Sequence, residues 1–455
     1  MSTSPALDAA RVKTLSDGFA GKVLLPSDEG YEAVRMVHNG LIDRRPAVIA
    51  QCHGTSDVVS AVRFATTEGL EISIRGGGHN VAGRCVTEGG VMIDLSGMRA
   101  IEVDPEAATA RVQGGVLWSE LNEAGAAHGL AVTGGAISTT GVAGYTLGGG
   151  LGWLMATQGL GSDNLIGVEL VTADGSVLDV SDASHPELMW ALRGGGGNFG
   201  VAASLTFRMH PVTMVVGGLI AHPLDAARDM LRFYRDAVAD CPDELTVFAG
   251  LVHAPDGSGL KLAAMIVFHT DPSRADADLA PFLGFGTPLM THVEPMPYPV
   301  MNTLLDDGYP RGALNYWLSS FTAGLSDKLI DTMIQRFQSV PSPMTAMVLE
   351  HFHGAVTRID PTATAVPHRE TGFNLLLTSE WLDPADTVQN IAWTKDTLAA
   401  VSEHLAARRW LNYLGDDQAD DAIRAAYGPN FDRLREVKRR YDPGNVFHLN
   451  HNIVP

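Results

Sequence analysis

Apolar residues recur along this chain with two different periods, and each period predicts one kind of element. A helical period opens at Thr55 and closes at Gly69, because glycine tolerates the left-handed turn that ends a helix. Its apolar positions share one face: Val58, Val59, Val62 and Ala65. Directly afterwards, a period of two over 70–74 predicts a strand that leads into a glycine run.

The same two periods predict the other elements of the first 210 residues: helices at 116–128 and 186–192, and strands at 91–95, 108–112 and 201–207. Two apolar runs over 165–180 flank Asp174-Gly175, a dipeptide that is favoured in type I′ hairpin turns. We therefore expect mixed α and β structure that includes an antiparallel hairpin.

Past about residue 210 the glycine density falls, and strand-like runs alternate with longer helical patterns: strands at 261–268, 345–356 and 373–379, helices at 326–337 and 392–404. We expect a second domain in which a sheet is backed by helices. Near the end, Asn430 is a candidate N-cap for a helix that reaches Tyr441 and is stopped by Asp442-Pro443-Gly444.

Length, charge and cysteine content narrow the classes of function. A chain of 455 residues is too long for one ordinary core and predicts two or three domains. Its formal charge of −20 opposes binding to nucleic acid or anionic lipid and favours small-molecule partners. The three cysteines are far apart in the sequence and do not predict a disulfide framework. Residues 1–17 lack the pattern of a signal peptide, and no apolar run is long enough to span a membrane. We expect a cytoplasmic protein without nucleic-acid or membrane partners.

The run Arg75-Gly76-Gly77-Gly78-His79-Asn80 combines a bare backbone with one nucleophilic ring. Three successive glycines place no Cβ between main-chain N–H groups and a ligand, so the loop can curl around a pyrophosphate. His79 follows at once, where its imidazole can reach the ring system of the same cofactor and attach to it covalently. The alternative is a glycine-rich turn with a surface histidine.

Two further glycine runs change this picture. Gly195, Gly197 and Gly200 match GxGxxG, but they follow a helix pattern and precede a strand, which is the reverse of a dinucleotide-binding Rossmann unit, so we reject that fold. The segment 134–152 holds eight glycines, interrupted by aromatic and branched residues. Such a composition argues against disorder and favours close approach of the backbone to a large planar ligand.

On these runs the chain resembles the vanillyl alcohol oxidase superfamily of FAD enzymes, and within it the berberine bridge enzyme-like branch. Five segments follow the order of that branch and together span nearly the whole chain: RGGGHNVAG (75–83), GVAGYTLGGGLGW (141–153), GLGSDNLIGVELVTADG (159–175), LMWALRGGGGNFGV (188–201) and YDPGNVFHLNHNI (441–453).

The resemblance implies an α+β fold in three parts. Residues 1–210 form a PCMH-type FAD-binding domain of two α/β subdomains. Residues 211–405 form an inserted substrate domain, an antiparallel sheet backed by helices, and residues 406–455 return to the first domain. The resemblance also implies that His79 is joined to the 8α-methyl carbon of FAD, a link that raises the flavin's reduction potential. The expected cofactor-binding residues are Arg75, Gly76, Gly77, Gly78, His79, Asn80, Gly83, Ser138, Thr139, Gly141, Gly144, Gly148, Gly149, Asn164, Gly200, Val201, Asn450 and Asn452.

One departure from the branch concerns a second covalent link. Many members carry a cysteine in a GGxCPTxG loop that bonds the flavin C6, and Ile137 occupies that place here, so we expect a single link. Cys85, six residues after His79, is expected to be a small buried hydrophobe. Thr140 stands where the branch lines the path of O₂ to the flavin, and its small side chain favours an oxidase. A monocovalent subgroup with a similar loop performs oxygenation, which stays as an alternative.

Oxidation of an alcohol needs a base opposite the flavin, because the O–H proton must be removed as the hydride leaves. Tyr413, in the family's NY element, is one candidate, and it requires a depressed pKa; Trp410 replaces the usual first tyrosine of that element. Glu350 is the second candidate, on a strand pattern that places it on the face opposite His351 and His353. The alternative interpretations are a packed aromatic for Tyr413 and a solvent-facing edge strand for Glu350.

The same strand carries a weak metal signal. Two histidines at His351 and His353 can ligate an ion jointly, but the sequence offers no third ligand motif nearby, and we expect no metal. His368, in a stretch similar to the family's TAxPHR element, is expected to be structural. Trp317, with Phe321 and Met344, lines either a pocket or the core.

The leading hypothesis for function is a covalent FAD oxidase, a monomer or homodimer, that acts on a hydroxyl-bearing or otherwise oxidisable small molecule and reduces O₂ to H₂O₂. Three alternatives stay open: amine oxidation, flavin-dependent oxygenation in specialised metabolism, and a non-catalytic protein that has kept the fold to bind flavin or another ligand.

Overall fold

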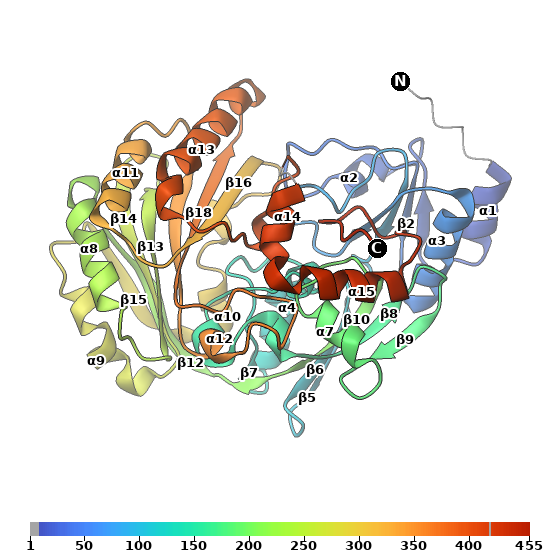
Figure 1. Ribbon diagram of the computed structural model, residues 1–455, viewed down its shortest axis with the longest axis horizontal. Helices are drawn as coiled ribbons and strands as arrows, with labels where there is room; N and C mark the ends of the chain where they lie inside the picture. Colours follow the sequence, from blue (N-terminus) through green and yellow to red (C-terminus); the bar gives the residue numbers. More distant parts are fainter. Residues whose placement is uncertain (1–8, 418–419) are drawn as a thin grey trace.

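The computed structural model describes residues 9–417 and 420–455. The N-terminal half of the chain forms two main sheets (Figure 1). The first sheet has the order β1-β2-β4-β3, with β2, β3 and β4 parallel and β1 antiparallel. Its strands are β1 (Lys22–Leu24), β2 (Val48–Gln51), β3 (Ile72–Arg75) and β4 (Val91–Asp94). The helices of this part are α1 (Ala9–Asp17), α2 (Tyr31–Arg35) and α3 (Thr55–Glu68). The apolar face expected on α3 packs into the core of this sheet through Val58, Val62 and Ala65.

The second sheet is antiparallel throughout and has the order β5-β6-β10-β8-β9. Its strands are β5 (Ile101–Asp104), β6 (Thr109–Gln113), β8 (Leu165–Val171), β9 (Val177–Val180) and β10 (Val201–Arg208). The helices of this part are α4 (Trp118–Ala126), α5 (Val142–Leu147), α6 (Met155–Gln158) and α7 (Pro186–Leu192). A short pair, β7 (Leu130–Ala131) and β11 (His210–Pro211), closes this half.

The β8–β9 hairpin is confirmed, but its expected turn type is wrong. Residues 172–176 connect the strands, and a type I′ turn needs positive φ at both central residues. Gly175 has φ +75°, whereas Asp174 does not adopt a positive φ. Asp174 instead stabilises the turn with its carboxylate, which accepts hydrogen bonds from the Thr172 hydroxyl and from Ser176.

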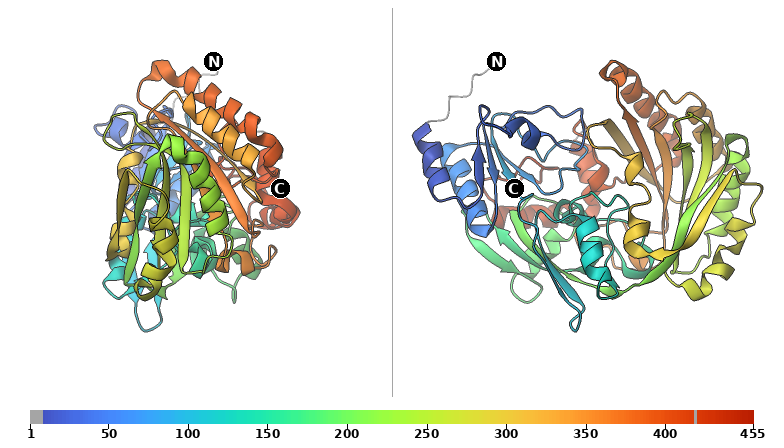
Figure 2. Two further views of the ribbon diagram at one scale, coloured as in Figure 1. Left: turned by 90° about the vertical axis from the view of Figure 1, so that its left-hand side faces the viewer. Right: turned by 180° about the vertical axis from the view of Figure 1, so that it is seen from behind.

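A seven-stranded antiparallel sheet forms the other lobe, with the order β15-β12-β14-β13-β17-β18-β16. Its strands are β12 (Met214–Pro223), β13 (Leu245–His253), β14 (Lys261–His269), β15 (Met290–Pro297), β16 (Leu314–Thr322), β17 (Ala346–Phe352) and β18 (Gly372–Trp381). Four helices cover its outer face, as Figures 1 and 2 show: α8 (Ala227–Ala237), α9 (Pro272–Leu283), α11 (Asp327–Gln338) and α13 (Thr387–Val401). The short helices α10 (Tyr298–Asn302) and α12 (Ala355–Arg358) lie in the connections.

The period of two along β17 separates the two faces of this sheet. Met347 and Leu349 belong to the core beneath the helices, whereas Val348 and Glu350 point to the face turned toward the N-terminal half. Since β17 lies between β13 and β18, it is an interior strand. The interpretation of Glu350 as an exposed residue on an edge strand is therefore wrong, and its side chain is 5% exposed.

Several predicted boundaries and one predicted cap differ from the structure. The strand expected over 345–356 ends at Phe352, because Gly354 takes a φ of +69° and α12 begins. Helix α13 begins at Thr387, five residues before its expected start at Ala392. Asn430 precedes α15 but adopts a helical conformation without a capping hydrogen bond, and its amide donates to the Pro361 carbonyl instead.

The C-terminal segment returns to the N-terminal half through α14 (Asp420–Tyr427) and α15 (Phe431–Tyr441), with α15 against α7 (Figure 1). A buried ion pair fixes it there. Lys438 Nζ lies 2.6 Å from Asp442 and donates to the carbonyls of Asn198 and Phe447, and neither charged side chain is exposed. The tail is thereby tied to the loop that follows α7.

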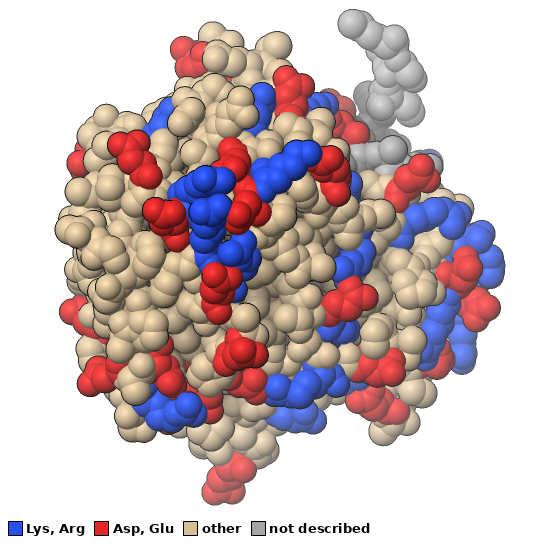
Figure 3. Space-filling view, turned by 60° about the vertical axis from the view of Figure 1, so that its left-hand side comes forward, with Lys and Arg blue, Asp and Glu red and all other residues tan. Residues whose placement is uncertain are grey.

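Charged side chains of both signs lie on the surface of the protein. On the face shown in Figure 3, Lys and Arg side chains are interspersed with Asp and Glu and form no single basic patch. Among the described helices, none combines the length and the apolar character that a membrane span requires.

Candidate active site

A cavity of about 780 Å³ lies between the glycine loops of the N-terminal half and the inner face of the seven-stranded sheet. Its wall includes the loops after β3 and before α5, the loop after α7, strands β13, β14, β17 and β18, and the segments around Tyr413 and Asn450. The inner face of the sheet is thus the wall opposite the glycine loops.

The glycine loops interlock backbone against backbone. A Cβ on Gly77 would lie 2.3 Å from the Gly141 amide nitrogen, and a Cβ on Gly141 would lie 2.3 Å from that of Gly77, so both positions require glycine. Gly144, one turn further along, lines the cavity, and a Cβ added there would meet nothing within 4 Å. The loops therefore form a bare cradle that is open on the side where a flat ligand would lie.

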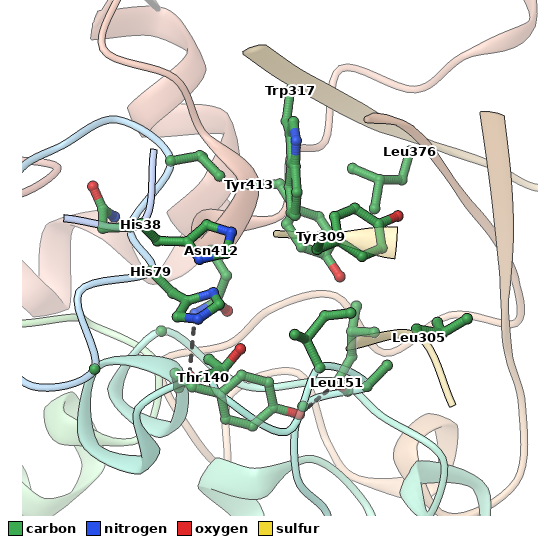
Figure 4. A pocket seen from close by; sticks show the side chains of 18 of the residues that line it. His38, His79, Thr140, Leu151, Leu305, Tyr309, Trp317, Leu376, Asn412 and Tyr413 are labelled. Carbon is green, nitrogen blue, oxygen red and sulfur yellow. Dashed lines mark hydrogen bonds between the residues drawn. The ribbon is translucent and has the colours of Figure 1, made fainter. Parts of the chain in front are cut away.

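His79 lies half-buried on the cavity wall, held by two neighbours (Figure 4). Its ring stacks on His38 with a centroid distance of 3.9 Å, and its Nε2 lies 2.9 Å from Thr139 Oγ1. Burial, together with His38, lowers the pKa of His79 to about 3. The imidazole is therefore neutral, and in the tautomer whose Nε2–H donates to Thr139 the lone pair of Nδ1 is free.

The C-terminal tail supplies polar groups to the same cavity. Asn450 Nδ2 donates to the Gly197 carbonyl at 2.9 Å, and Arg84 donates to the Asn450 carbonyl at 2.6 Å. Both ring nitrogens of His451 and the Nε of Arg84 are buried without a hydrogen-bond partner in the protein. Because buried polar atoms are nearly always satisfied, these groups and the glycine cradle fit a ligand with polar atoms along its length and a flat ring, such as FAD.

Tyr413 and Glu350 meet on the sheet side of the cavity. Tyr413 Oη donates to Glu350 Oε1 at 2.9 Å, and Asn374 Nδ2 donates to Oε2 at 2.6 Å. Burial raises the pKa of Glu350 to about 7, against the opposing effect of these two donors. Burial and the Glu350 charge raise the pKa of Tyr413 well above its ordinary value. The depressed pKa that Tyr413 would need as an independent base is therefore not found.

The rest of the sheet side is apolar and aromatic. Figure 4 shows Leu305, Tyr309, Trp317 and Leu376 on the side of the cavity away from His38 and His79. The Trp317 ring contacts Tyr413 edge-on at a centroid distance of 5.9 Å and Tyr309 at 5.6 Å. Such a wall favours a substrate with a flat or bulky apolar body.

Most of the predicted residues converge on this cavity. The cavity wall includes Gly76, Gly77, Gly78, His79, Asn80, Thr140, Gly141, Gly144, Gly148, Gly200, Asn450, Glu350 and Tyr413. The structure does not place eight of the expected cofactor-binding residues on it: Arg75, Gly83, Ser138, Thr139, Gly149, Asn164, Val201 and Asn452.

Several of these eight residues make contacts within the protein. Arg75 forms a buried ion pair with Asp94 at 2.6 Å, just before the glycine loop. Ser138 donates to Asp306 from both its backbone and its hydroxyl, and Asn164 donates to the Leu160 carbonyl. Gly83 (φ +68°) and Gly149 (φ +114°) form turns, Val201 opens β10, and the Asn452 side-chain oxygen is buried without a partner. Thr139 acts through its contact with His79.

Sequence reasoning missed several residues of the wall: His38, Arg84, Gly196, Gly197, Asn412 and His451. The glycine run after α7 carries the family resemblance, but of its glycines only Gly200 is expected on the cofactor, whereas Gly196 and Gly197 also line the cavity. His38 has no sequence signal, because only the fold brings it to His79. Of the three uncertain aromatic and Met positions, Trp317 and Met344 line the cavity, whereas Phe321 lies in the core.

Two positions bear on the number of nucleophiles at the cavity. Ile137 lies on the wall and offers none. Cys85 also lies on the wall, but burial raises the pKa of its thiol to about 11, so the thiol stays protonated. His368 is buried against Phe321 with a ring-centroid distance of 5.0 Å, outside this cavity.

Comparison with known proteins agrees with this geometry. The family described as FAD binding domain matches residues 46–181, and the family described as berberine and berberine like matches residues 410–454. The (R)-6-hydroxynicotine oxidase of Paenarthrobacter nicotinovorans is 31% identical, over 96% of this chain and 97% of its own. These matches cover both the glycine loops and the C-terminal tail that meet at the cavity.

Solved structures show the same fold. The crystal structure of 6-hydroxy-D-nicotine oxidase from Arthrobacter nicotinovorans has a TM-score of 0.88 at 28% identity and covers 96% of this chain and 98% of that one. Glucooligosaccharide oxidase from Acremonium strictum, studied for its 6-S-cysteinyl, 8α-N1-histidyl FAD, shares the fold with a TM-score of 0.85 at 23% identity, over 98% of this chain and 99% of that one. The chain therefore belongs to the berberine bridge enzyme-like family of FAD-linked oxidoreductases.

Proposed function

We propose that this protein is an oxidase that removes a hydride from a hydroxyl-bearing carbon of a small molecule with an apolar body. The observation that carries the proposal is the Tyr413–Glu350 hydrogen bond on the wall of the cavity that also contains the glycine cradle and His79. FAD bound in the cradle supplies the hydride acceptor and passes the electrons to O₂, which yields H₂O₂.

His79 is the residue that holds the flavin covalently, at its 8α-methyl carbon. The proposal is supported by a neutral imidazole whose orientation is set by His38 and Thr139 and whose Nδ1 is free. A single link is supported by the other two wall positions, because Ile137 has no nucleophile and the Cys85 thiol stays protonated.

The Tyr413–Glu350 pair removes the hydroxyl proton as one unit. Tyr413 Oη takes the proton of the substrate while its own proton passes to Glu350 Oε1, so the phenol is restored and the carboxylate becomes a neutral acid. A carboxylate with a pKa near 7 is a better proton acceptor than an exposed one, and Asn374 keeps it oriented. Thr140 leaves room on the opposite wall for O₂.

The test is anaerobic reduction followed by air. Aromatic and aliphatic alcohols are screened for bleaching of the visible flavin absorbance, and H₂O₂ is measured when air restores it. Reduction by alcohols with formation of peroxide is the expected result. Reduction by amines alone would replace the proposed substrate class, and incorporation of ¹⁸O from labelled O₂ into the product would favour an oxygenase.

A further inference from the structure

The inner strand β17 carries a second group of chemically active side chains on the face away from the cavity. His351 follows Glu350 on the strand and His353 lies just past its end, so both lie under the helices rather than toward the substrate. Cys241 reaches them from the connection between α8 and β13. One ligand atom from each of the three residues lies within 4.8 Å of the other two.

The histidines of this cluster are buried and incompletely satisfied. Their exposed fractions are 2% for His351 and 7% for His353, and Nδ1 of each ring is buried without a hydrogen-bond partner. Unpartnered nitrogens in a buried site call for an explanation, because nearly all buried polar atoms in folded proteins find a partner.

The two imidazole rings also stack on each other. They are nearly parallel, with centroids 4.5 Å apart, and Phe373 stacks against His351 from the neighbouring strand. His353 Nε2 lies 3.0 Å from the Leu245 carbonyl, which can only accept, so Nε2 carries the proton and Nδ1 keeps its lone pair. A backbone carbonyl on the second nitrogen is the usual support of a histidine that ligates a metal.

We propose that Cys241, His351 and His353 bind a divalent transition-metal ion, and that this ion is Zn²⁺. One thiolate and two imidazoles are ligands that Zn²⁺ takes in tetrahedral sites, and they leave its fourth position to water or another donor. Mg²⁺ and Ca²⁺, which require oxygen ligands, do not match this set. On binding, the Cys241 Sγ–H bond breaks, an Sγ–Zn bond forms, and the proton goes to solvent.

The proposed metal site lies outside the FAD cavity, and a bound metal there would act on the stability of the fold. It joins β17 to the turn before β13, so bound metal cross-links two segments more than 100 residues apart in sequence, Cys241 and His351. A ligand that binds only the folded state stabilises it. We therefore expect Zn²⁺ to raise the unfolding temperature without changing the flavin content.

The test uses the full-length, flavin-loaded protein. After treatment with EDTA and desalting, Zn²⁺ or Mg²⁺ is titrated by calorimetry, and retained metal is measured by elemental analysis after a second desalting. We expect one Zn²⁺ per chain and no Mg²⁺. The variants Cys241→Ser and His353→Gln should each lower the Zn²⁺ affinity at least about tenfold, while Cys52→Ser, a buried cysteine outside the cluster, keeps it.

A second measurement needs no variant. Zn²⁺ should slow alkylation of Cys241 in the unaltered protein, as followed by peptide mass spectrometry, and EDTA should restore the rate. An unaltered protein that retains no Zn²⁺ overturns the proposal. So does Zn²⁺ that leaves Cys241 reactivity unchanged, or that the Cys241→Ser and His353→Gln variants retain as well as the unaltered protein does.

Discussion

Tyr413 and Glu350 form a hydrogen bond of 2.9 Å, although one residue lies in the C-terminal segment and the other on an interior strand of the seven-stranded sheet. The bond joins two candidates for one role into a single group. Neither residue alone is a good base for a substrate hydroxyl at neutral pH. The pKa of Tyr413 is raised, and the Glu350 carboxylate is already bonded to Tyr413 and Asn374.

Substitution of either partner should slow flavin reduction. Glu350→Gln keeps the shape and still accepts the Tyr413 hydrogen bond, but it cannot take a proton. We expect the rate of anaerobic flavin reduction by an alcohol substrate to fall by about 10² to 10⁴, the range typical of a lost general base. Tyr413→Phe should slow it as well, and stopped-flow absorbance measures both.

The matched control is Tyr316→Phe, which removes a hydroxyl that is bonded to Asp417 outside the cavity. It should leave the reduction rate unchanged. If Glu350→Gln and Tyr413→Phe both turn over normally with flavin bound, the base assignment is wrong.

The flavin link should depend on His79 alone. Acid-denatured protein is expected to keep one FAD on the peptide that contains His79, and the His79→Ala variant is expected to release all of its flavin, as mass spectrometry can show. Cys85→Ser is the control, because Cys85 lies on the same wall with a protonated thiol. Flavin found on the Cys85 peptide would contradict a single link.

Two neighbouring glycines should respond differently to an added methyl group. Gly141→Ala forces a Cβ to within 2.3 Å of the Gly77 backbone, and we expect about 1–3 kcal/mol of destabilisation together with loss of flavin. In Gly144→Ala the Cβ meets nothing within 4 Å of the protein, so the fold should keep its stability while flavin occupancy falls. Thermal unfolding and the flavin-to-protein absorbance ratio separate the two effects.

Gly324→Ala serves as the control for both variants, since Gly324 lies outside the cavity and a Cβ there also meets nothing within 4 Å. It should change neither stability nor flavin content. Full flavin occupancy in Gly144→Ala would mean that the cofactor does not lie over this glycine.

The sequence predicted the local elements around the site better than the contacts between them. The alternation of β17 correctly placed Glu350 opposite His351, because side-chain direction in a strand depends only on the period of two. That β17 is an interior strand could not be predicted, since strand order is set by pairing with β13 and β18, whose residues are far away in the chain.

The other features that the sequence did not predict are contacts between residues that are far apart in the chain. The stacking of His38 on His79, the Tyr413–Glu350 bond and the approach of Cys241 to His351 all depend on how the lobes and loops pack. The missed turn at Asp174 has a local cause, since the Asp174 carboxylate bonds to Thr172 and Ser176 and favours a different turn from the one its dipeptide suggests.

The buried ion pair of the C-terminal segment should be a determinant of stability. Lys438→Met leaves the Asp442 carboxylate buried without its cation, and it also removes the hydrogen bonds to the Asn198 and Phe447 carbonyls. We expect a loss of about 3–5 kcal/mol in the free energy of unfolding, as is typical when one partner of a buried pair is removed.

Lys13→Met is the matched control, because Lys13 pairs with Asp17 at the surface, where the side chains are 72% and 63% exposed. It should cost no more than about 1 kcal/mol. Denaturant unfolding of the flavin-loaded protein measures both variants. Since α15 and the tail bring Asn450 to the cavity, Lys438→Met should also loosen flavin binding, and equal stability of the two variants would show that the tail is held by other contacts.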